Sequence, residues 1–189
     1  MIMRKFRRHG YTLIEMMLVV VLIGIMGRIA FTKVSLSRFK ADGAMRVVQA
    51  VLQQAERTAV QRQMEVMISF DTVGQRVRTL YDANGNHAVD AGEEVHWRAL
   101  EEGNRFSVPS VGVNGAVSKS IAGSNLSVSP EGYPTVYYHR DGASSAPVEV
   151  YLRAWNTDTN AFRALVVTQA TGRVDIYNYG NGQWRKAGI

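Results

Sequence analysis

A run of apolar residues near the N-terminus constrains this chain more than any other feature. Residues 13–27 are all apolar or glycine except for Glu15, and this composition predicts a helix that avoids water. At about 1.5 Å per residue the run would extend roughly 22 Å, which is less than the ~30 Å hydrocarbon core of a bilayer. The sequence therefore predicts a membrane-seeking helix that needs its flanking residues to span a bilayer.

The positive charge of the chain is concentrated in front of this run. Residues 1–10 contain no acidic residue and four basic ones, namely Arg4, Lys5, Arg7 and Arg8. The net charge of +6 comes from 22 basic and 16 acidic residues, so only +2 remains when these four are set aside. A basic block before an apolar run indicates membrane targeting. The nearly neutral remainder argues against a broad nucleic-acid surface.

Glu15 is the one charged residue inside the run. An acidic side chain at membrane depth costs on the order of 2.5 kcal/mol or more unless it is paired. If the chain is cut after Gly10, the new α-amino group of Tyr11 is a cation four residues away. Such an amino group on a neighbouring subunit would offset the cost of the glutamate. The pattern thus predicts that these helices assemble with one another.

The segment HG-YTLIEMMLVVVLIGIM, from His9 to Met26, resembles the class III signal of type IV pilins and type II secretion pseudopilins. The resemblance implies that a prepilin peptidase cuts after Gly10, that the amino group of Tyr11 is methylated, and that Glu15 guides filament assembly. It also implies a single-pass protein of the bacterial inner membrane, whose N-terminus is cytoplasmic before cleavage and whose C-terminal domain is periplasmic. The sequence departs from the usual pattern at Tyr11, where phenylalanine is commonest, and at Arg28, which enters a normally apolar segment.

A second helical pattern follows from Val34 to about Arg62. Its apolar residues recur every three or four positions, as on one face of an amphipathic helix: Val47, Val48, Val51, Leu52, Ala55, Ala59 and Val60. No proline interrupts residues 11–62, so both patterns can join as one helix of 52 residues, roughly 78 Å long.

From Met64 the period changes to two, which predicts a half-buried strand over residues 64–71. Further strands are expected around Val95–Ala99 and in the last third of the chain, where short alternating segments indicate an antiparallel meander. The expected fold class is α+β, pilin-like, with a long N-terminal helix before an antiparallel β-sheet or sandwich domain. The expected parts are a basic prepilin leader (1–10), a transmembrane part (11–30), an amphipathic part (31–62) and a periplasmic β domain (63–189).

Three later phrases resemble the H-type pseudopilin family, which includes the minor pseudopilin GspH of type II secretion and FimT-like minor pilins. They are AERTAVQRQMEVMISF (55–70), DANGNHAVDAGEE (82–94) and TGRVDIY (171–177). The resemblance implies a minor subunit of the type II protein secretion system that assembles into or caps a pseudopilus. Its implied partners are the prepilin peptidase, other major and minor pseudopilins or pilins, and the inner membrane. The alternative is a FimT-like minor pilin of a type IV pilus that acts in pilus assembly or DNA uptake.

The segment from Asp82 to Glu93 has the spacing of a calcium-binding loop. Oxygen-bearing side chains stand at its positions 1, 3, 5, 9 and 12, namely Asp82, Asn84, Asn86, Asp90 and Glu93. Position 6, normally glycine, is His87, which would have to adopt a left-handed backbone. The alternative is a polar hairpin that needs no Ca²⁺, since Asn, Asp and Gly favour turns by themselves.

Other chemistry finds little support in the sequence. Some FimT-like relatives bind DNA through a Gly-Arg-x-Arg element, but here Gly172 and Arg173 are followed by Val174 and Asp175. An anion in place of the second arginine repels phosphate, so Arg173 is only a weak DNA-binding candidate and DNA is not an expected partner. The absence of cysteine excludes disulfides and thiolate metal sites. No catalytic or cofactor-binding motif is found, so a membrane-tethered hydrolase is disfavoured and no enzymatic activity is expected.

Overall fold

The computed structural model describes residues 11–33, 36–101, 103–115, 120–121, 126–154 and 162–188. The chain divides into two compact units, Met1–Leu36 and Ser37–Ile189. The first unit contains helix α1 (Leu13–Lys33). Helix α2 (Leu36–Arg62) lies almost wholly in the second unit, together with the strands. Both predicted helical segments are therefore helical in the structure, while residues 34–35 between them lie outside the described residues.

Helix α1 starts with a reciprocal cap. The backbone N–H of Glu15 donates to Thr12 Oγ1 at 3.3 Å, and the backbone N–H of Thr12 donates to Glu15 Oε2 at 3.5 Å. This is the capping-box arrangement of a threonine followed three residues later by a glutamate. The large apolar side chains from Leu13 to Met26 are exposed on every face of the helix. Among the helices of the described residues, none is both long enough and apolar enough to cross a membrane.

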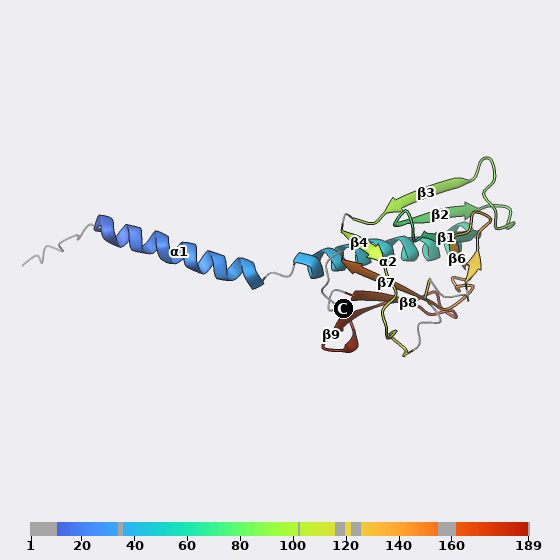
Figure 1. Ribbon diagram of the computed structural model, residues 1–189. Coiled ribbons are helices and arrows are strands. Elements are labelled where there is room, and N and C mark those ends of the chain that lie inside the picture. Colours follow the sequence, from blue (N-terminus) through green and yellow to red (C-terminus); the bar gives the residue numbers. More distant parts are fainter. Residues whose placement is uncertain are drawn as a thin grey trace, which may run out of the picture. The chain divides into compact units, whose positions relative to one another are not determined.

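The strands of the described residues form two five-stranded antiparallel sheets (Figure 1). The first has the order β3-β2-β1-β6-β5 and consists of β1 (Glu65–Asp71), β2 (Arg76–Asp82), β3 (Glu94–Ala99), β5 (Ser127–Val128) and β6 (Pro134–Tyr138). The second has the order β10-β9-β8-β7-β4 and consists of β4 (Asn104–Phe106), β7 (Val148–Ala154), β8 (Phe162–Val167), β9 (Val174–Gly180) and β10 (Gln183–Lys186). The predicted C-terminal meander is therefore confirmed as β7 to β9, and β10 extends it by one strand that was not predicted.

Helix α2 and both sheets share one hydrophobic core. The helix contributes Ala44, Met45, Val48, Leu52, Ala55 and Ala59, all of which are almost completely buried. They recur every three or four residues, so they form a single stripe along the helix. The same cluster takes in side chains from the first sheet, such as Ile68 and Val136, and from the second sheet, such as Val150 and Leu165. The predicted apolar face is thus confirmed at Val48, Val51, Leu52, Ala55 and Ala59, whereas Val47 is only half-buried outside this cluster and Val60 is exposed.

Strand β1 differs from its prediction as a half-buried strand, since both of its faces are buried. Met67, Ser69 and Asp71, on the face expected to meet water, are all buried. Met67 packs with Leu80 and Tyr137 in a second apolar cluster on this outer face. The period of two is therefore real, but it separates two packed faces rather than a packed face from a solvated one.

A buried arginine anchors part of this outer face. Arg78 on β2 is 4% exposed, and its guanidinium donates to Ser69 Oγ at 3.2 Å and to Glu131 Oε2 at 3.0 Å. The bond from Arg78 is the main reason that the pKa of Glu131 falls from 4.5 to about 2. Because this pKa is depressed in the folded state, the pair stabilises the fold above pH 4.5 and stops doing so as the pH falls toward 2.

We expect Glu131→Gln to lower the free energy of unfolding at pH 7 by about 1–2 kcal/mol. The variant leaves the Arg78 charge buried without its carboxylate, although the half-exposed position of Glu131 moderates the loss. The difference from wild type should shrink between pH 4.5 and 2. Urea unfolding at pH 7, 4 and 3 measures this, with Glu101→Gln at an exposed carboxylate as the matched control. A difference that does not change with pH would contradict the prediction.

Candidate functional sites

The residues predicted to carry processing and assembly lie at the start of α1. Gly10 lies outside the described residues. Tyr11 is exposed just before the helix, and Glu15 is exposed in its first turn. Glu15 has two possible roles, as a partner in the helix cap and as a negative charge on an apolar helix. The two roles can be tested separately, because glutamine also completes a capping box but carries no charge.

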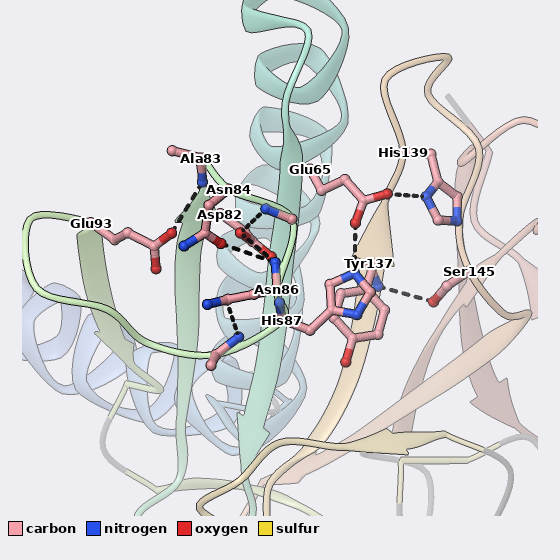
Figure 2. Close-up of polar contacts among 12 residues, drawn as sticks. Glu65, Asp82, Ala83, Asn84, Asn86, His87, Glu93, Tyr137, His139 and Ser145 are labelled. Carbon is pink, nitrogen blue, oxygen red and sulfur yellow. Dashed lines mark hydrogen bonds and ion pairs between the residues drawn. The ribbon is translucent and has the colours of Figure 1, made fainter.

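The second predicted site, the loop between β2 and β3, is organised around Asp82. This residue is 1% exposed. Its Oδ1 accepts the backbone N–H groups of Gly85 at 2.6 Å and Asn86 at 3.3 Å, and its Oδ2 accepts that of His87 at 2.8 Å. His87 has a φ of 59°, the left-handed conformation expected at this position. The Asp82 carboxylate therefore holds the turn together from inside (Figure 2).

The remaining four predicted calcium ligands are also used within the loop. Asp90 Oδ2 accepts the side-chain amides of Asn84 at 2.7 Å and Asn86 at 2.5 Å. Glu93 accepts the backbone N–H groups of Ala83 and Asp90, each at 3.1 Å. Asp90 and Glu93 do not belong to the one group of potential metal ligands found in the described residues. This arrangement favours the polar hairpin, while the calcium site stays a prediction.

Sequence reasoning missed a cluster that joins this loop to the sheet. Glu65 at the start of β1 lies between two histidines: its Oε2 is 2.7 Å from His87 Nε2, and its Oε1 is 2.9 Å from His139 Nδ1 (Figure 2). Burial by itself would raise the pKa of Glu65, but the hydrogen bonds from both histidines outweigh it and lower the pKa. The His87 ring lies against the Tyr137 ring, with 4.1 Å between centroids.

The strand register explains why these residues meet. Glu65 is directly opposite Asp82 in the β1–β2 pair, and Val66 is opposite Tyr138 in the β1–β6 pair. The two neighbours of β1 therefore deliver the 82–93 loop and His139 to the same end of the sheet. Each histidine lies in a different segment of the chain, so no local motif could reveal the cluster.

Arg173, the weak DNA-binding candidate, is paired with the aspartate that replaces the second arginine. Its guanidinium donates to Asp175 Oδ2 at 2.7 Å, and Lys186 Nζ lies 3.0 Å from the same oxygen. Burial tends to raise the pKa of Asp175, but its bonds to Lys186 and Arg173 lower it overall. One anion thus engages two cations, which reduces the attraction of this surface for phosphate.

Two family models match the chain. The prokaryotic N-terminal methylation motif matches residues 5–27, and the type II transport protein GspH matches residues 44–172, which is more than half of the chain. The protein belongs to the type II transport protein GspH family. The methylation motif covers Gly10, Tyr11 and Glu15, and the GspH match covers α2 from Ala44 and most of the two sheets.

Solved structures show the same fold. The minor pseudopilin EpsH from the type 2 secretion system of Vibrio cholerae matches with a TM-score of 0.50 and 10% identity, over 75% of this chain and 99% of that one. The type IV minor pilin FimU of Pseudomonas aeruginosa matches with a TM-score of 0.50 and 14% identity, over 78% and 94%. No protein of curated function matches the sequence significantly. The pilin-like α+β fold predicted from the sequence is confirmed.

Membership of the GspH family also bears on activity and partners. GspH pseudopilins are structural proteins, so the prediction that this chain is not an enzyme is confirmed by its family. The methylation motif implies processing by a peptidase, and the family implies association with other pseudopilins.

Proposed function

We propose that this GspH-family protein is a minor subunit of a type II secretion pseudopilus, which it joins or caps after cleavage between Gly10 and Tyr11. The observation that carries the proposal is the coupling, in one chain, of the methylation motif over residues 5–27 to the GspH match over residues 44–172. The motif supports a single-pass position in the bacterial inner membrane, and the β domain then lies in the periplasm.

The structure of α1 suggests how the subunits associate. Its apolar side chains are exposed on every face, so bundling with neighbouring helices would remove a large apolar surface from its surroundings. In this proposal cleavage after Gly10 frees the α-amino group of Tyr11, which becomes methylated. The Glu15 carboxylate of one subunit then pairs with the Tyr11 amino group of the next, so that neither charge stays unpaired among apolar helices.

Crosslinking of the full-length protein in native membranes, followed by identification of the captured subunits, tests the proposal. We expect capture of the major secretion pseudopilin and other minor pseudopilins. Capture of pilus subunits instead would favour the alternative, a FimT-like minor pilin in pilus assembly or DNA uptake. Capture of neither would overturn both. The intact mass of the membrane protein should correspond to a chain that starts at Tyr11 and carries a methyl group.

We expect Glu15→Gln to reduce this crosslinking at least tenfold while leaving cleavage after Gly10 unchanged. Glutamine can maintain the reciprocal cap with Thr12, so the variant removes the charge and retains the start of the helix. Thr12→Ala is the matched control because it removes the Oγ1 acceptor of the cap and leaves the carboxylate in place. If Thr12→Ala abolished crosslinking and Glu15→Gln did not, the cap rather than the charge would be what assembly requires.

A further inference from the structure

Four polar side chains from separate segments converge at one end of the first sheet. They are Glu65 from β1, Asp82 from the end of β2, His87 from the following loop and His139 after β6 (Figure 2). Glu65 contacts one histidine with each of its oxygens. Single potential ligand atoms of Glu65, Asp82 and His87 all lie within 4.8 Å of one another.

This combination of groups suits a transition metal better than calcium. Ca²⁺ takes oxygen ligands, whereas a set of imidazole and carboxylates is typical of Zn²⁺ and related ions. Zinc holds N and O ligands at about 2.1 Å in a tetrahedral arrangement, so its ligand atoms lie about 3.4 Å apart. Separations of up to 4.8 Å between the ligand atoms would therefore need to shorten by at most about 1.4 Å on binding. The ion would take the place of the proton that His87 and Glu65 now share in their hydrogen bond.

The surrounding structure already fixes the orientation of each group. The Asp82 carboxylate accepts the backbone N–H of His87 and so holds the left-handed turn that directs this residue toward Glu65. The Tyr137 ring supports the His87 imidazole. His139 Nδ1–H donates to Glu65 Oε1 and leaves Oε2 facing His87. Hydrogen bonds of this kind orient the carboxylate ligands of metal sites.

We propose that Glu65, Asp82 and His87 bind a divalent transition metal of the zinc class, with His139 as a positioning residue for Glu65. The site is separate from the calcium loop predicted from the sequence and shares only Asp82 with it. It is also independent of the proposed role in a pseudopilus, since it lies in the second compact unit, whereas Tyr11 and Glu15 lie in the first.

Calorimetric titration of the untagged full-length protein, stripped of metal with a chelator, tests the site. We expect one Zn²⁺ per chain and no comparable heat with Ca²⁺ or Mg²⁺. Co²⁺ should give visible absorption bands of a four- or five-coordinate nitrogen and oxygen site. An absence of Zn²⁺ binding overturns the proposal, and so does binding of Ca²⁺ in preference to Zn²⁺, which would instead support the calcium loop.

His87→Asn is the most informative variant, because asparagine tolerates the left-handed backbone and removes the imidazole. We expect it to weaken Zn²⁺ binding at least 100-fold. His139→Asn should weaken binding about tenfold, as expected for a positioning residue. His96→Asn is the matched control: His96 also contacts a carboxylate, Glu94 Oε1 at 2.7 Å, but on the exposed strand β3. Equal affinities for His87→Asn and His96→Asn would refute the site, and Glu65→Gln tests it again if His87→Asn fails to fold.

Discussion

Gly172→Ala is expected to lower the free energy of unfolding by about 3 kcal/mol. Gly172 lies in the turn between β8 and β9 with a φ of 64°, a left-handed conformation that costs an alanine about 1 kcal/mol. An added Cβ would overlap the backbone carbonyl oxygen of Gly142 and lie 3.0 Å from Tyr138 Cε1. Tyr138 is fully buried and Gly142 belongs to a tight turn, so neither can move away without disturbing the core. Forced overpacking of this kind costs about 1–3 kcal/mol.

Gly182→Ala is the control that separates the cost of the left-handed backbone from the cost of the steric overlap. Gly182 has a φ of 76°, but a Cβ there would meet no atom within 4 Å. This variant should therefore lose only the cost of the left-handed backbone, about 1 kcal/mol. Urea unfolding of both variants gives the comparison. Equal losses for Gly172→Ala and Gly182→Ala would show that the contacts with Gly142 and Tyr138 contribute nothing.

Asp82→Ala is also expected to lower the free energy of unfolding by about 3 kcal/mol. The Asp82 carboxylate accepts three backbone N–H groups of the 82–93 loop, and the variant removes all three bonds. Asp82 itself is only 1% exposed, so its removal also leaves a space in a buried position. A donor that loses its charged acceptor costs about 1–3 kcal/mol, and because Gly85, Asn86 and His87 are themselves exposed, water replaces part of the loss and limits the sum. Hydrogen exchange of the amides of Gly85, Asn86 and His87 should accelerate together.

Asp90→Ala is the matched control for this prediction. Asp90 accepts two side-chain amides at an exposed position, and water can replace these bonds. The loss should stay below about 1 kcal/mol. If Asp90→Ala were as destabilising as Asp82→Ala, the loop would depend on its exposed side chains rather than on the buried carboxylate beneath it.

Periodic apolar patterns predicted the long helices and several strands, but they miss strands that are very short or that bury polar side chains. The apolar repeat of α2 places its end at Arg62, and the alternation from Met64 locates β1. Strand β2 was missed because Arg76 and Arg78 occupy one of its faces and Thr79 interrupts the apolar residues of the other. The burial of Arg78 depends on its partners Ser69 and Glu131, which the sequence alone does not place beside it. Strands β4 and β5 have three and two residues, too few to show a period.

One missed element had a readable signal. Strand β10 follows the pair Asn181-Gly182, whose φ angles of 52° and 76° suit a type I′ hairpin turn. An Asn-Gly pair between short alternating segments is a strong indication of a hairpin, so β9 and β10 could have been predicted as a pair.

The site could be predicted only in part. The spacing of Asp82 to Glu93 predicts a polar loop and a left-handed His87, and the structure has both. The spacing could not show that Glu65 lies beside His87, because 22 residues separate them and 74 separate Glu65 from His139. These contacts depend on the register in which β2 and β6 pair with β1. Register is a property of the assembled sheet, and no short motif encodes it.

Because α2 and both sheets share a single core, a force that pulls on the N-terminal end of a subunit acts on the whole second unit. Tension applied at Leu36 enters the second unit along α2, whose buried stripe extends from Ala44 to Ala59 and packs in the same cluster as strands of both sheets. Sliding the helix along its axis would break the contacts of the whole buried stripe with the strands of both sheets at once. The domain should therefore resist traction as one mechanical unit and yield abruptly rather than by gradual unravelling.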